Sequence, residues 1–237
     1  MQSAWTLLSW GPEGWLDDIA YGVFITVSLA AATLPVGLAI GFVVALAKQS
    51  DEPSLRLAGN VYTTIFRGLP ELLTLFLVYY GVQTLLQSLV RVFDPTASVE
   101  VNSFVSGMVA LGVVFSSYSS EVFLSAFRAI PHGQYEGGYA IGLTGFQTMR
   151  LVVLPQLIRI ALPGLANLWL ILLKDTALVS AIGLSDILRQ SGVAARVTRE
   201  PFLFFGVACA IYLVLAIISS FGINAVERSV SQSGVRR

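Results

Sequence analysis

Charged residues are scarce in this sequence of 237 residues: Asp, Glu, Lys and Arg make up 12% of it, against about 25% in an average soluble domain. The formal net charge is zero, so no basic excess points to nucleic acid as a partner. The chain has one cysteine, Cys209, and one histidine, His132. A disulfide within the chain is therefore excluded, and a metal cluster or histidine-based catalysis lacks the necessary residues. We expect no metal, no cofactor and no catalytic activity of the chain's own.

A phosphate-binding loop of the P-loop type is also absent. Such a loop needs a lysine directly after a glycine to reach the phosphates. The only two lysines, Lys48 and Lys174, follow alanine and leucine. Any ATP chemistry linked to this chain must therefore come from a partner.

Long apolar stretches are abundant instead. Four of them, each 19 to 29 residues without a charge, are long enough to cross a bilayer: 19–47, 72–90, 101–120 and 201–226. A 14-residue run, 160–173, is counted as a fifth span, because Arg159 and Lys174 at its ends can extend to the interface. We predict an all-α polytopic protein in the lipid bilayer, a single domain over 1–237 with five transmembrane helices at about 19–47, 62–90, 101–128, 158–174 and 201–226.

The basic residues indicate how these spans are oriented. With five spans, nine Lys and Arg fall on the side of the first loop, the third loop and the C-terminal tail, and five fall on the other side. Cytoplasmic loops carry an excess of Lys and Arg, so we expect the C-terminus in the cytoplasm and the acidic N-terminal tail outside. The fourth loop opposes this trend, because it places four basic residues outside: Lys174, Arg189, Arg196 and Arg199.

The segment 131–155, between the third and fourth spans, is polar and rich in glycine. Residues 134–141 can form about two helical turns before Gly142, where a helix commonly ends in a left-handed residue. Thr144 and Gln147 then fit a capping box, and Pro155 is expected to close a second helix. We predict a helix, a glycine turn and a second helix on the cytoplasmic face, which is either a plain interfacial loop or a docking surface for another protein.

Part of this segment resembles a family motif. Glu136, Gly142, Leu154 and Pro155 are spaced as in the EAA motif of permease subunits of bacterial ABC importers: EAA, three residues, G, nine residues, I-x-L-P. In this chain glycines 137 and 138 replace the two alanines and Val152 replaces the isoleucine. The glycines keep the small size but weaken the helix by about 1 kcal/mol each. The resemblance implies a coupling helix that docks in an ATP-hydrolysing subunit, with these docking residues: Glu136, Gly137, Gly138, Ala140, Gly142, Leu154 and Pro155.

Three further segments are similar to the polar amino acid branch of these permeases. They are FRGLPELLTLFLVYYG (66–81), SSYSSEVFLSAFRAIPHGQYEGG (116–138) and LLKDTALVSAIGLSDILRQ (172–190). The resemblance implies the type I importer permease fold in a bacterial inner membrane. It also implies a second permease subunit, like or unlike, two ATP-binding subunits and an external solute-binding protein. The cargo implied is a polar amino acid or an opine, with a basic one favoured.

Five residues near the ends of the spans are candidates for the transport path: Thr64, Arg67, Glu71, Ser117 and Glu121. Ionisable groups within a membrane are costly and usually face protein or a water-filled path. Arg67 and Glu71 are four residues apart, so we expect them on one helix face. The competing interpretations are a local salt bridge between these two and close helix packing through the serines around Ser117.

Lys174 and Asp175 begin a segment that resembles the external gate region of the family. Two interpretations remain open for this pair. It seals the closed state, or Asp175 is simply the N-cap of the next helix.

Two other classes of protein compete with the permease interpretation. A stand-alone secondary carrier or channel would show inverted repeats around charges at the midplane, and no such repeat is found in the sequence. A membrane scaffold without transport activity would not need the segment 131–155.

Overall fold

The computed structural model describes residues 4–94, 96 and 101–235, so Arg236 and Arg237 of the charge count lie outside it. Within these ranges the chain is helical and contains no strand. Five stretches there are long and apolar enough to cross a membrane: Leu16–Gln49, Glu71–Phe93, Ser103–Ala129, Gly145–Ile182 and Pro201–Ser229. The predicted all-α fold with five membrane helices is confirmed.

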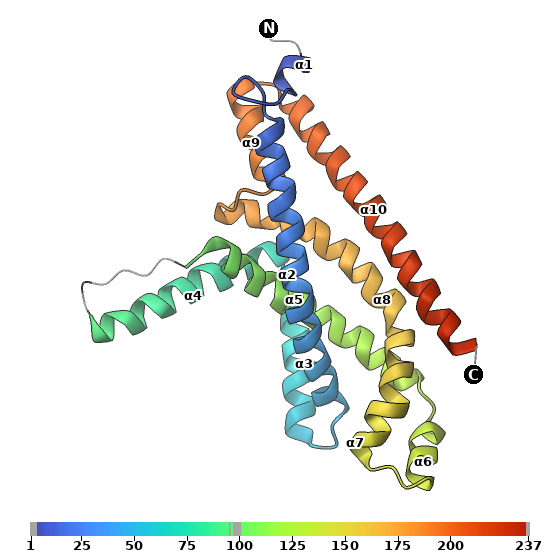
Figure 1. Ribbon diagram of the computed structural model, residues 1–237. Helices are drawn as coiled ribbons and strands as arrows, with labels where there is room; N and C mark the ends of the chain where they lie inside the picture. Colours follow the sequence, from blue (N-terminus) through green and yellow to red (C-terminus); the bar gives the residue numbers. More distant parts are fainter. Residues whose placement is uncertain (1–3, 95, 97–100, 236–237) are drawn as a thin grey trace.

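The helices follow one another with short connections (Figure 1). In chain order they are α1 (Ala4–Leu7), α2 (Leu16–Gln49), α3 (Pro53–Gly68), α4 (Glu71–Phe93), α5 (Ser103–Ala129), α6 (His132–Ala140), α7 (Gly145–Thr148), the π-turn η1 (Met149–Val153), α8 (Leu154–Asp175), the 3₁₀ helix η2 (Thr176–Ile182), α9 (Ile187–Thr198) and α10 (Pro201–Val235).

The single helix expected over 62–90 is in fact two helices. α3 ends at Gly68 and α4 begins at Glu71, with Leu69 extended at φ −91° and ψ 143°. Pro70 is the reason, because its ring disfavours a helical conformation in the residue before it. Arg67 and Glu71 therefore lie on different helices, and the expected shared helix face between them is wrong. α4 projects away from the other helices (Figure 1).

Close packing of α2 against α5 forms the centre of the fold. Gly37 and Gly41 of α2 face α5 so closely that an added Cβ would lie 2.5 Å from the Phe115 ring and 2.0 Å from Ser119 Oγ. Four buried serines of α5 donate to carbonyls on their own helix, as Ser117 Oγ does to Val114 O at 2.7 Å; the others are Ser116, Ser119 and Ser120. Small residues thus bring the two long helices into close contact.

A second correction concerns Pro155. It does not close the helix after Gly145, because the chain continues through η1 into α8. The Leu154 N–H bonds back to Met149 O, five residues earlier. This wide π-turn makes room for the proline ring, which would otherwise clash with the carbonyl four residues before it.

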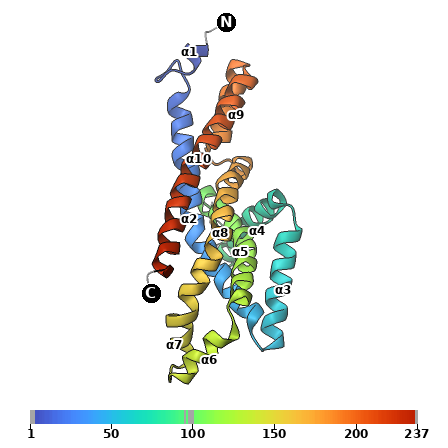
Figure 2. The same cartoon turned by 90° about the vertical axis from the view of Figure 1, so that its right-hand side faces the viewer.

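The two ends of the bundle are formed by different elements (Figures 1 and 2). The segment α6–α7 and the turn between α2 and α3 lie at one end. α1, α9 and the start of α10 lie at the other. A small cluster of buried residues joins α1, α2, α9 and α10 there: Leu7, Ile19, Ala194, Ala195 and Phe204.

Candidate functional site: a docking hairpin, an ion cluster and an acidic cavity

The segment 131–155 forms the predicted helix, turn and second helix. Gly142 follows α6 at φ 83°, the left-handed conformation expected of it. The capping box is present in both directions, with Gln147 N donating to Thr144 Oγ1 at 3.3 Å and Thr144 N donating to Gln147 Oε1 at 2.9 Å. The local sequence alone therefore accounts for the shape of this hairpin.

The outer surface of the hairpin is open. Glu136, Gly137 and Ala140 on α6 are exposed, as are Gly142 and Pro155, while Leu154 is partly buried. Ile141 and Phe146 expose 76% and 74% of their area although they are large and apolar. An exposed apolar surface rimmed by polar residues marks a protein or membrane interaction site.

Gly138 has a different role from the other small residues of α6. It is buried, and an added Cβ would lie 2.6 Å from Thr148 Cγ2 and 2.7 Å from Thr148 Oγ1. Its small size lets α6 contact the second helix of the same hairpin. Gly137, by contrast, has nothing within 4 Å, so its open side is available to a partner.

These two neighbours make a matched test of the hairpin. We expect Gly138→Ala to push α6 away from Thr148 and to speed amide hydrogen exchange in α6 at least several-fold. We expect Gly137→Ala to slow it, because alanine stabilises a helix by about 1 kcal/mol relative to glycine. Hydrogen exchange of the purified permease followed by mass spectrometry measures both. The reverse order of the two variants would contradict this packing.

An ion cluster joins three helices beside the α2–α5 contact. Lys48 at the end of α2 forms an ion pair with Glu121 Oε1 of α5 and donates to Thr63 Oγ1 of α3 at 3.1 Å. Arg67 Nη1 lies 3.3 Å from the same Glu121 oxygen, and its guanidinium lies over the Tyr118 ring, 5.6 Å from the ring centre. The side chain of Lys48 is only 7% exposed, against 31% for Glu121 and 45% for Arg67. One carboxylate thus pairs with two cations.

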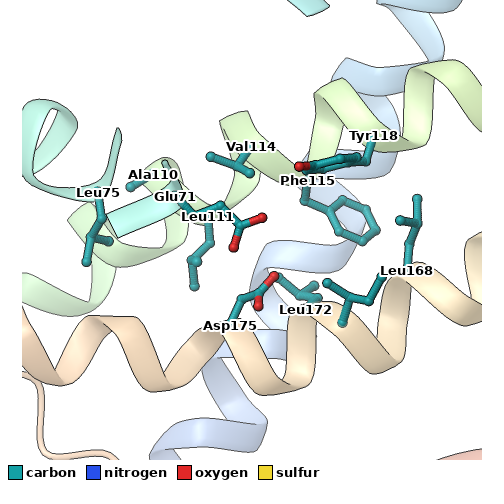
Figure 3. A pocket seen from close by; sticks show the side chains of 11 residues that line it. Glu71, Leu75, Ala110, Leu111, Val114, Phe115, Tyr118, Leu168, Leu172 and Asp175 are labelled. Atoms are coloured by element: carbon teal, nitrogen blue, oxygen red, sulfur yellow. The ribbon is translucent and has the colours of Figure 1, made fainter. Parts of the chain in front are cut away.

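An acidic cavity lies on the other side of Tyr118. Leu75 and Glu71 line it from α4, Ala110 to Tyr118 from α5, and Leu168 to Asp175 from α8. The Glu71 and Asp175 carboxylates point toward each other across it (Figure 3). The cavity measures about 20 Å³, which is room for one water molecule. An amino acid can enter only if these helices move apart.

The other predicted residues do not share this cavity. Arg67 and Glu121 meet in the ion cluster, Ser117 is buried against its own helix, and Thr64 is exposed. Lys174 is exposed while Asp175 faces the cavity, and the described residues show no ion pair between them. Asp175 stands at the N-cap position of η2, as one of the two interpretations expects, but its side chain makes no capping hydrogen bond.

Lys48 and Tyr118 of these sites were not identified as functional candidates from the sequence, and neither was Asp186, which is buried outside them. Asp186 is the N-cap of α9, where its Oδ1 accepts from Arg189 N at 2.9 Å. Burial raises the pKa of Asp186 to about 6, although that backbone N–H opposes the rise. A serine, threonine or aspartate before a helical pattern was the available signal for this cap. Lys48 and Tyr118 offered none, because their partners are distant in sequence.

Comparison with known proteins agrees with these features. A family model described as "Binding-protein-dependent transport system inner membrane component" matches residues 35–232. The chain is 41% identical over 232 residues to the nopaline transport system permease protein NocQ of Agrobacterium fabrum, covering 98% of each. It is 35% identical to the histidine/lysine/arginine/ornithine transport system permease protein HisQ of Escherichia coli, covering 94% of this chain and 97% of that one.

A solved structure supports the same fold. It is the crystal structure of an amino acid ABC transporter with histidines, which matches with a TM-score of 0.77 and 29% identity over 90% of this chain and 94% of the other. Since the family model covers most of the length and the relatives match end to end, the chain belongs to the family of binding-protein-dependent transport system inner membrane components.

Proposed function

We propose that this inner-membrane permease forms, as a single domain over 1–237, half of the translocation pathway of an ATP-driven importer for basic amino acids or opines. A second permease subunit completes the pathway, ATP-binding subunits dock on 131–155, and a solute-binding protein delivers cargo from outside. The N-terminus is outside and the C-terminus is cytoplasmic. One observation carries the proposal: the exposed hairpin lies at one end of the bundle and connects directly to α5 and α8, two of the three helices that line the acidic cavity.

That connection gives a mechanical route from docking site to cargo site. α5 lines the cavity through Ala110 to Tyr118 and ends at Ala129, just before the hairpin. α8 follows the hairpin without a break and reaches the cavity at Leu168 to Asp175. When the ATP-binding subunits close, movement of the hairpin is transmitted along two rigid helices to the cavity walls. The closed cavity opens toward one side of the membrane or the other in turn.

The charge of the cavity supports a cationic cargo. Glu71 and Asp175 present two carboxylates to a site with little water, where like charges repel and a positive group between them is strongly stabilised. The HisQ relative is named for transport of histidine, lysine, arginine and ornithine, the last three of which carry a positive side chain at neutral pH. The NocQ relative is named for transport of nopaline. The chemistry of the site and the relatives thus favour the same class of cargo.

ATP-driven uptake into proteoliposomes that contain the complete importer tests the proposal. We expect Glu136→Lys and Gly142→Asp to abolish uptake and to stop the ATP-binding subunit from co-purifying, while the permease still inserts. Gly142→Asp also strains the backbone, since φ 83° suits glycine. The matched control is Glu52→Lys, at an exposed site of the same end but outside 131–155, which we expect to leave uptake within about twofold of wild type.

Two results would overturn the proposal. Uptake and co-purification that survive both hairpin variants would make the segment 131–155 an ordinary loop. Transport by the purified chain alone, without ATP, would favour a secondary carrier.

A further inference from the structure

The end of the bundle opposite the hairpin carries an unexpected set of arginines. Arg189 and Arg196 lie two turns apart on α9, so they share a helix face, and Arg199 follows as the C-cap of this helix. All three are exposed. In the proposed orientation they lie outside, against the usual excess of basic residues in the cytoplasm. Their position therefore requires a reason other than topology.

None of these arginines forms an ion pair within the described part of the chain. Ion pairs there join only Lys48 and Arg67 to Glu121. Arg189 donates to the carbonyl of Ser180 at 3.4 Å, a long hydrogen bond. Three permanent positive charges are thus left facing outward along one helix.

Arg199 is also held in a strained conformation. Its φ of 60° and ψ of 28° are left-handed, and it is the one described residue other than glycine with a positive φ. A residue with a Cβ is strained in this conformation, and a glycine would relieve the strain. An arginine at a position whose backbone suits glycine indicates that its side chain has a use.

Acidic residues lie beside the arginines at the same end. Glu13, Asp17 and Asp18 are exposed between α1 and the first turn of α2. Ile19 of α2 packs in one cluster with Ala194 of α9, so the acidic and basic groups are held on adjacent helices. This arrangement of both signs suits a protein surface with a complementary pattern. It does not suit a uniformly anionic lipid surface, which the carboxylates would repel.

We propose that the arginine face of α9, defined as Arg189, Arg196 and Arg199, docks an acidic patch of the external solute-binding protein. The inference rests on the proposed function, because that function supplies both the orientation and the partner. Arginine suits this role, since its planar guanidinium binds carboxylates through two parallel hydrogen bonds. Complementary charge of this kind steers the encounter and sets the register of docking. α9 is joined through η2 to Asp175, so the docked protein would sit next to the gate of the acidic cavity.

The test uses the complete importer in nanodiscs of neutral lipid, with the solute-binding protein that stimulates ATP hydrolysis by the wild type. We expect Arg196→Glu with Arg199→Glu to raise the binding-protein concentration for half-maximal stimulation at least about tenfold. ATP hydrolysis without binding protein should not change. Arg56→Glu with Arg228→Glu, a pair of exposed arginines elsewhere on the chain, is the matched control and should shift the half-maximal concentration by less than about twofold.

A second variant separates docking from folding. Arg199→Gly relieves the backbone strain, so we expect it to raise the thermal midpoint of the permease and yet to weaken stimulation by the binding protein. Unchanged half-maximal concentrations in both arginine variants would overturn the inference. So would a shift that appears only in anionic nanodiscs, because lipid would then be the partner. Failure of the proposed function gives a different result from failure of this inference. If the proposed function is wrong, Glu136→Lys leaves ATP hydrolysis coupled to the permease.

Discussion

Replacement of Glu121 by glutamine is expected to abolish uptake and to lower the stability of the permease by roughly 3 kcal/mol. The reason is the charge balance of the ion cluster. Glu121 is the shared partner of Lys48 and Arg67, and the Lys48 side chain is 7% exposed. Without the carboxylate, a buried ammonium is left with no counter-charge and with a second cation nearby. Thermal unfolding of the purified permease and ATP-driven uptake measure the two effects.

Lys48→Met is the informative comparison, because it should be much milder. Methionine has nearly the length of lysine and suits a buried position, and Arg67 still neutralises Glu121. The double variant Lys48→Met with Glu121→Gln should recover part of the stability lost in Glu121→Gln alone, since the uncompensated buried cation is gone. This positive coupling is the signature of a direct ion pair.

A different order of stabilities among these variants would contradict the structural role of the ion cluster. If Glu121→Gln unfolds at the wild-type temperature, the carboxylate has no structural role. If the double variant loses more stability than the two single variants lose together, Lys48 and Glu121 do not interact in the way the structure shows.

The ion cluster is a feature that the sequence alone does not predict. The five apolar stretches follow directly from composition, and the hairpin follows from local chemistry: Thr144 with Gln147 for the cap, and Gly142 for the turn. Lys48 and Glu121 are 73 residues apart, and no local rule pairs them. The incorrect expectation that Arg67 and Glu71 share a helix face has a different cause, because here a local rule was applied across a break in the helix. A spacing of four residues predicts a shared face only within one helix, and Pro70 interrupts it.

The acidic cavity is another feature that the sequence alone does not predict. Glu71 and Asp175 were each candidates in the sequence, but for different roles, as a path residue and a gate residue. They meet because Pro70 redirects α4 and because α8 continues through Pro155, so that both side chains reach one cavity. Both proline effects are visible as residues in the sequence. Their consequence for the distance between two carboxylates depends on how the helices pack, which is a tertiary property.

The second large effect is expected at this cavity. Asp175→Asn should reduce uptake of arginine at least about tenfold, since one charge contact with a cation in a dry site is worth about 1.4 kcal/mol or more. Glu71→Gln should act in the same direction. Glu71 begins α4, where the helix dipole already stabilises its negative charge, whereas Asp175 at the end of α8 has no such support. We therefore expect the aspartate variant to show the larger change in cargo preference.

Citrulline, which is nearly isosteric with arginine but uncharged, makes the role of charge visible. Uptake of both solutes is compared in proteoliposomes with saturating binding protein, and the quantity measured is the ratio of the two rates. In the wild type the ratio should favour arginine, and in Asp175→Asn it should fall about tenfold. Asp17→Asn, an exposed carboxylate at the start of α2 and outside the cavity, should leave the ratio unchanged. An equal loss for both solutes would mean that Asp175 holds the helices in place without contacting the charge of the cargo, and the cation site between Glu71 and Asp175 would have to be abandoned.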